Sequence, residues 1–210
     1  MNKTHVYTDT GKSSPAIGLQ IIDLHVVRGM TIVISGLSHQ QQAGDIFCLT
    51  GPNGAGKSTL LRTIANRLPA ANGQIYCSAP LVYVGHNDGL SGSISGRANL
   101  QGWAKINEFL CSPAEIERAL IRFAAESFAD IAVHLLSRGQ RRRLALTRLA
   151  LAPTNSLWLL DEPNSSLDKA SNAILDGAVI EHTAGGGMVL AATHLDFAAA
   201  ASPQFLSLPR

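Results

Sequence analysis

The chain has 210 residues, 46% of them hydrophobic, and a formal net charge of +2 at pH 7. This length and composition fit one α/β domain with a sizeable core. The charge is too small to indicate binding to nucleic acid or to an anionic membrane. No apolar stretch reaches the about 18 residues of a membrane-spanning helix, and the polar N-terminus lacks the apolar core of a secretion signal. We therefore expect membrane association only through a partner.

The N-terminal part predicts a tail followed by strands. Residues 1–16 are polar and include Gly11-Lys12-Ser13-Ser14-Pro15, which indicates a flexible tail ahead of a single domain over residues 17–210. Apolar and β-branched residues predict strands over Leu19–Val27 and Thr31–Gln42, broken at Arg28-Gly29. A third apolar run, Asp45–Thr50, predicts a buried strand.

A glycine-rich segment with the spacing G-x-x-x-x-G-K-[ST] follows that strand directly. Its glycines let the backbone curl so that successive amides point at one anion. Lys57 adds a positive charge for the β- and γ-phosphates, and the Ser58 hydroxyl is a suitable Mg²⁺ ligand. Apolar residues at helical spacing follow, so the loop opens a helix whose dipole favours phosphate. We predict a nucleoside triphosphate site built from Gly51, Pro52, Asn53, Gly54, Ala55, Gly56, Lys57, Ser58 and Thr59.

The middle of the chain changes to a helical pattern. A turn at Asn72-Gly73 and short strands over Gln74–Tyr76 and Leu81–Gly85 come first. Residues 94–128 then predict helices, with Ser112 as an N-cap followed by a first-turn proline and a capping-box glutamate. We interpret this region as an inserted helical lobe, within a helical subdomain of about residues 94–150.

The α/β pattern then resumes. Alternating strands and helices favour a parallel sheet covered on both faces. The predicted elements are a helix over about Gly139–Leu151, a strand over Leu157–Leu160, a helix over about Asp168–Thr183 and a last strand over Met188–Ala192.

Two carboxylates follow the strand at Leu157–Leu160. A buried strand would deliver Asp161 to its carboxyl end, where it can hold Mg²⁺ through water. Glu162 can then orient and polarise the attacking water, which makes it a candidate catalytic residue.

The segment Leu136-Ser137-Arg138-Gly139-Gln140, followed by a basic helix, resembles the signature of ATP-binding-cassette (ABC) ATPases, Leu-Ser-Gly-Gly-Gln. Arg138 stands where the family usually has glycine. The resemblance implies that Ser137, Gly139 and Gln140 bind the γ-phosphate at a helix N-terminus. We predict that Arg141-Arg142-Arg143 form a solvated helix face rather than a nucleic-acid site, since aromatic residues are not interleaved with them.

The remaining family positions follow in order. The resemblance implies that His86 occupies the place of the family's Q-loop glutamine, and that Asp168 ends the D-loop, which crosses between subunits. It also implies that His194 is the catalytic switch histidine at the γ-phosphate. Arg28 stands where an aromatic residue often stacks on adenine.

Beyond these motifs, Tyr83–Leu90 and Ser95–Leu100 are similar to the ATP-binding subunits of the haem exporters of bacterial cytochrome c maturation. The resemblance extends from about residue 17 to the end. It implies an α/β P-loop NTPase fold of the ABC ATPase type, with a mostly parallel central sheet, an N-terminal antiparallel β subdomain and an inserted helical lobe.

The same resemblance implies the partners. Two copies would enclose two ATP molecules with Mg²⁺, and each would dock on an integral-membrane ABC subunit at the cytoplasmic face of the bacterial inner membrane. The cycle would serve haem export or haem-chaperone release, without contact between the ATPase and haem.

Three alternatives are open. An ABC ATPase for a different exported cargo would have the same ATP-site residues. A soluble ABC protein acting on DNA or ribosomes is disfavoured, because the chain has one cassette and no heptad repeats. A P-loop kinase or GTPase would lack the signature and the switch histidine.

Overall fold

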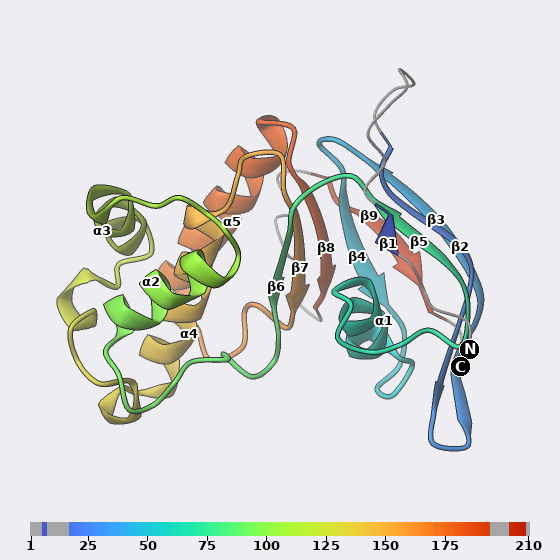
Figure 1. Ribbon diagram of the computed structural model, residues 1–210, viewed down its shortest axis with the longest axis horizontal. Coiled ribbons are helices and arrows are strands. Elements are labelled where there is room, and N and C mark those ends of the chain that lie inside the picture. The colour runs from blue at the N-terminus through green and yellow to red at the C-terminus, as the bar shows by residue number, and fades with distance from the viewer. Residues whose placement is uncertain (1–5, 8–16, 194–201, 209–210) are drawn as a thin grey trace.

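The computed structural model describes residues 6–7, 17–193 and 202–208 (Figure 1). This part of the chain consists of two sheets, a helix between them and a group of helices on the outer face of the larger sheet. The strands are β1 (Val6–Tyr7), β2 (Ile17–Arg28), β3 (Thr31–Gln42), β4 (Ile46–Thr50), β5 (Asn72–Cys77), β6 (Leu81–Val84), β7 (Leu157–Asp161), β8 (Met188–Ala192) and β9 (Gln204–Ser207). The α-helices are α1 (Lys57–Ile64), α2 (Gly96–Ile106), α3 (Pro113–Arg122), α4 (Arg138–Leu146) and α5 (Lys169–Ala184).

The smaller sheet has the order β1-β5-β2-β3. β2 pairs antiparallel with β3 and with β5, which confirms the predicted antiparallel subdomain. β1 pairs parallel with β5, so Val6 and Tyr7 of the expected tail lie beside the smaller sheet. The other residues of the expected tail, 1–5 and 8–16, lie outside the described residues. The turn expected at Asn72-Gly73 instead begins β5.

The larger sheet is entirely parallel and has the order β6-β7-β8-β4-β9. This confirms the predicted mostly parallel central sheet. The prediction that β8 is the last strand is wrong, because β9 adds to the edge beyond β4. Beyond β9 the pairing continues, since the Leu208 amide donates to the Thr50 carbonyl at 2.9 Å. The C-terminal segment therefore lies beside the strand that leads into the glycine-rich loop.

The side chains of the parallel strands alternate between two cores. Leu157 and Leu159 of β7 pack with α1 and with the smaller sheet, whereas Trp158 and Leu160 pack with α4 and α5. This alternation follows from the period of two of a β-strand. Figure 1 accordingly shows α1 between the two sheets and α4 and α5 on the opposite face of the larger sheet.

The expected helical lobe contains α2 and α3, which share a third core. The predicted capping box at Ser112 is present, with Glu115 as its acidic member. α4 is shorter than expected: it ends at Leu146 and continues as the 3₁₀ helix η3 (Thr147–Leu151). None of the helices in the described residues has the length and apolar character that crossing a membrane requires.

Candidate nucleotide-binding site

The glycine-rich loop joins the carboxyl end of β4 to the N-terminus of α1, as expected. At two positions of this loop, close neighbours leave no room for a side chain. Gly51 has φ 137°, and a Cβ there would lie 2.7 Å from the Leu208 carbonyl oxygen. Gly56 has φ 96°, and a Cβ there would lie 2.7 Å from the Val33 side chain. The segment after β9 and the strand β3 therefore support the loop from two sides.

The Lys57 ammonium group lies inside this loop. It donates hydrogen bonds to the carbonyl oxygens of Gly51 at 2.7 Å and Pro52 at 3.1 Å. A flexible ammonium held only by carbonyl groups can exchange them for phosphate oxygens, which form stronger, charge-assisted hydrogen bonds. The loop and the N-terminus of α1 thus form a concentrated set of anion-binding donors.

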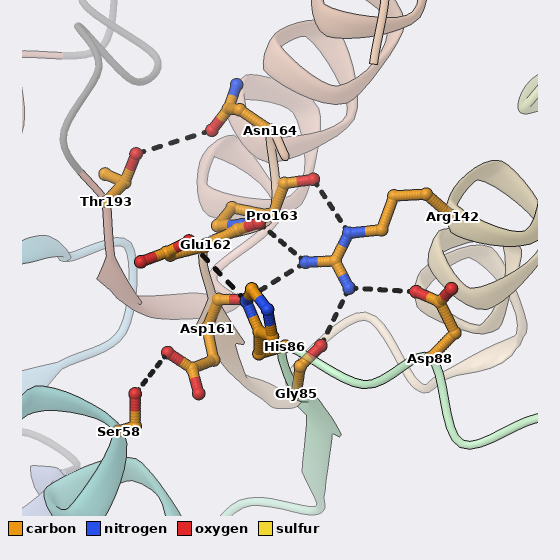
Figure 2. A network of polar contacts seen from close by, with 10 residues as sticks. All are labelled: Ser58, Gly85, His86, Asp88, Arg142, Asp161, Glu162, Pro163, Asn164 and Thr193. Carbon is orange, nitrogen blue, oxygen red and sulfur yellow. Dashed lines mark hydrogen bonds and ion pairs between the residues drawn. The ribbon is translucent and has the colours of Figure 1, made fainter. Parts of the chain in front are cut away.

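Asp161 lies at the end of β7, next to the loop. The Ser58 hydroxyl donates to Asp161 Oδ1 at 2.8 Å (Figure 2). Asp161 is only 1% exposed, and its second oxygen, Oδ2, has no hydrogen-bond partner among the described residues. Because a buried unpaired carboxylate oxygen is costly, this arrangement fits a cation.

The residues present suit Mg²⁺ in particular. Among the described residues no three His, Cys, Asp or Glu side chains form a metal-binding group. Mg²⁺ commonly takes one or two protein oxygens and completes its shell with water and substrate phosphates. Ser58 and Asp161 supply such a pair of oxygens.

Glu162 follows Asp161 in a tight turn. Its φ is 48°, in the left-handed region, and its amide donates to the Ala192 carbonyl of the neighbouring strand at 2.7 Å. Its carboxylate lies 3.5 Å from His86 Nδ1, and the two side chains are 43% and 50% exposed. An accessible carboxylate beside the Ser58–Asp161 pair is suitably placed to act on a water molecule. The structure therefore brings together Lys57, Ser58, His86, Asp161 and Glu162.

The signature residues lie at the start of α4 and form a capping box. The Gln140 amide donates to the Ser137 hydroxyl at 3.2 Å, and the Ser137 amide donates to the Gln140 side chain at 2.8 Å. A Cβ at Gly139 would lie 3.0 Å from the Ser166 carbonyl oxygen, so α4 packs closely on the segment after β7. α4 and α1 pack on opposite faces of the larger sheet (Figure 1). Within one chain, the signature and the glycine-rich loop therefore lie on different sides of that sheet.

The other predicted site residues lie at a helix cap, on the surface or outside the described residues. Asp168 caps α5 by accepting a hydrogen bond from the Ser171 amide at 2.8 Å, and this bond lowers the pKa of the Asp168 carboxyl. Arg28 is exposed at the end of β2. His194 lies outside the described residues. Thr193, directly before it, donates to the Asn164 side chain at 3.5 Å (Figure 2).

Comparison with known proteins places this site in a family. The family model described as ABC transporter matches residues 34–165, which include the glycine-rich loop, the signature and the acidic pair. The chain belongs to the ABC transporter ATP-binding family. As a member, it is an ABC-type ATPase that binds ATP.

Curated bacterial proteins named as export proteins are similar to this chain. The chain is 40% identical over 188 residues to the cytochrome c biogenesis ATP-binding export protein CcmA of Paramagnetospirillum magneticum, covering 83% of this chain and 86% of the relative. It is 43% identical over 181 residues to CcmA of Rhodobacter capsulatus, covering 85% and 81%.

Solved structures share the fold. An ATP-binding subunit of an ABC transporter matches with a TM-score of 0.80 and 23% identity, covering 92% of this chain and 86% of that one. A dimeric ATP-binding cassette in a post-hydrolysis state, bound to ADP and phosphate, matches with a TM-score of 0.77 and 20% identity, covering 90% and 94%.

One expectation about this ABC ATPase is wrong. Arg142 does not lie on a solvated helix face: it is 2% exposed, and its guanidinium points into the site (Figure 2). The sequence spacing could have predicted this burial. Arg142 precedes Ala145, Leu146 and Leu149 at the i, i+3, i+4 and i+7 spacing of one helix face, and all four are buried. The sequence analysis did not single out two further residues near the site: Asp88, whose carboxylate accepts from Arg142, and Asn164, whose side chain accepts from Thr193 (Figure 2).

We predict that His86→Gln retains ATPase activity. A polar contact between half-exposed side chains contributes about 0–1 kcal/mol, so turnover should stay within about fivefold of the unmodified ATPase. A glutamine amide can donate to the same Glu162 carboxylate. Steady-state phosphate release at saturating Mg-ATP measures this, with His134→Gln in the helical lobe as the matched control. Complete loss in His86→Gln alone would show that the imidazole has a specific chemical task.

Proposed function

We propose that this chain is the ATP-hydrolysing subunit of a bacterial inner-membrane ABC complex that handles or exports haem in cytochrome c maturation. The observation that carries the proposal is the 40% identity over 83% of the chain to a protein named for cytochrome c biogenesis and export. The ATP-site residues are common to ABC ATPases and do not themselves specify the cargo.

The site supports a mechanism for ATP hydrolysis. The loop amides and Lys57 would bind the β- and γ-phosphates, and Ser58 and Asp161 would hold Mg²⁺. When bound, Mg²⁺ would neutralise charge on the phosphate oxygens. Glu162 would orient the attacking water and accept its proton, since its accessible carboxylate follows the metal-binding residue directly. His194 is proposed to contact the γ-phosphate.

A second copy would complete the site. Ser137, Gly139 and Gln140 begin a helix whose N-terminus favours anions, yet α4 packs on the sheet face opposite α1. A dimer would bring these residues of one copy to the γ-phosphate held by Lys57 of the other, with Asp168 near the crossing. The dimeric state of one structural neighbour supports this arrangement.

The membrane partner is proposed to be the integral-membrane ABC subunit of the cytochrome c maturation complex. The chain would attach to the cytoplasmic face of the inner membrane through that subunit alone. No nucleic-acid partner is proposed, and the burial of Arg142 supports this, because it removes the central charge of the arginine run from the surface.

Two measurements in the native host test the proposal. A tagged chain should retain an integral-membrane ABC subunit when it is purified from detergent-solubilised membranes. Deletion of the chain should abolish covalently haem-stained c-type cytochromes, and the unmodified chain should restore them whereas Glu162→Gln should not. Normal c-type cytochromes in the deletion strain would assign the ATPase to a different cargo.

A further inference from the structure

One buried arginine connects the signature helix to the catalytic turn. A guanidinium has five N–H donors, and the five hydrogen bonds of Arg142 account for them (Figure 2). The acceptors are the carbonyl oxygens of Asp161 at 3.0 Å, Glu162 at 2.7 Å, Pro163 at 3.1 Å and Gly85 at 2.7 Å, and the Asp88 carboxylate at 3.2 Å.

These acceptors come from two segments that meet at adjacent strands. Three consecutive carbonyl groups belong to the turn that leaves β7. Gly85 and Asp88 flank the segment that leaves β6, and His86 lies within it. β6 and β7 pair in parallel, so both turns begin at the same edge of the sheet. Arg142, on α4, thus holds the two turns together and joins both to the helix that the signature opens.

The turn that carries Glu162 needs such support. A left-handed backbone is unfavourable for a residue with a Cβ and persists where the surroundings over-determine it. Here the Glu162 amide donates to the Ala192 carbonyl, and the Glu162 carbonyl accepts from Arg142 at 2.7 Å and from the Ser165 amide at 3.1 Å. Without the guanidinium, the carbonyl groups of residues 161–163 lose the one donor that joins all three, and the turn is left with its bonds to Ser165 and Ala192 at Glu162. The carboxylate of Glu162 would then shift from the position where it meets water.

The shape of the guanidinium, together with its charge, makes this role specific to arginine. Burial lowers the pKa of Arg142, and the neighbouring Asp88, Asp161 and Glu162 oppose that shift. Asp88 is 19% exposed at its side chain and forms the ion pair. A lysine keeps the charge, but its compact ammonium cannot reproduce the planar fork that reaches five acceptors.

We propose that Arg142 is a positioning residue for ATP hydrolysis, which fixes the Glu162 turn and ties the His86 segment to it. Arg142 touches backbone around the site rather than the phosphates, so it acts through Glu162. The inference rests on ATP hydrolysis by this chain and does not depend on the cargo.

The decisive variant is Arg142→Lys in the full chain. We expect kcat to fall by about 10–100-fold, as for a misplaced catalytic group, while KM and the Kd for ATP change less than about threefold. Arg143→Lys is the matched control, since Arg143 lies on the same helix and donates to the Ala124 carbonyl in the helical lobe. It should keep near-native turnover. Equal kcat values in the two variants would overturn the proposal, as would a loss confined to KM.

Combined variants separate positioning from a merely structural role. In a Glu162→Gln background, Arg142→Lys should not reduce the residual hydrolysis further, because residues that act through one another are non-additive. A further drop of the full size would contradict action through Glu162. Asp88→Asn provides a second variant in case Arg142→Lys does not fold, and it should lower kcat with KM unchanged. If Asp88→Asn, or a folded Arg142→Lys, turns over at the native rate, the proposal fails.

The unmodified chain distinguishes this proposal from the proposed function. If it does not hydrolyse Mg-ATP, the ATPase mechanism itself fails. If it hydrolyses ATP and Arg142→Lys does so equally well, only the positioning role fails.

Discussion

Glu162→Gln is expected to reduce ATP turnover by about 10²–10⁴-fold, the usual contribution of a general acid–base group, while ATP still binds. Glutamine has nearly the same shape, so the backbone turn held by Ala192 and Arg142 should persist. The amide cannot accept the proton of the attacking water. Steady-state phosphate release measures turnover, and calorimetric titration with Mg-ATP measures binding.

The same variant should accumulate as an ATP-bound dimer, visible as a larger species in size-exclusion chromatography with Mg-ATP. Glu117→Gln is the matched control: its carboxylate is 45% exposed, close to the 43% of Glu162, but it pairs with Arg97 in the helical lobe. The control should hydrolyse ATP at the native rate. Unaltered hydrolysis in Glu162→Gln would remove Glu162 from the role of water activator.

Lys57→Ala is expected to act on the earlier step and weaken nucleotide binding. Hydrogen bonds to charged groups contribute about 1.5–3 kcal/mol, which corresponds to a rise in Kd of about 10–100-fold. The variant also loses the two bonds that the ammonium makes to the Gly51 and Pro52 carbonyls, so the loop is less well ordered before nucleotide arrives.

Titration with Mg-ATP and Mg-ADP measures the effect of Lys57→Ala. Lys105→Ala is the control, because Lys105 is an exposed lysine in the last turn of α2. An unchanged Kd in Lys57→Ala would mean that the loop amides alone bind the phosphates.

The helices and strands that were predicted correctly are marked by the residues of their own segments. β4, β7 and β8 are continuous apolar runs, as strands buried on both faces should be, and Ser112 and Glu115 marked the start of α3. β9 was missed, because a four-residue strand with mostly exposed side chains lacks a burial pattern. Its pairing with β4 defines it, and that pairing is tertiary.

The exposure of Arg141, Arg142 and Arg143 likewise depends on the tertiary structure. Composition alone favours solvent for all three arginines, and Arg141 and Arg143 are in fact partly exposed. Arg142 is buried because its position on α4 turns its side chain toward two strand ends whose carbonyl groups accept hydrogen bonds from it. Those acceptors come from segments far from it in sequence, so only the fold shows that its charge can be satisfied.

By itself, the sequence determined the anion-binding loop, because its glycines, lysine and serine are contiguous and their geometry is local. It likewise determined that an acidic pair ends a buried strand. The tertiary structure decided which distant groups meet: Ser58 with Asp161 across 103 residues, His86 with Glu162, and Arg142 with both turns. The register of the parallel strands sets these contacts, since it brings the carboxyl ends of β4, β6 and β7 to one edge of the sheet.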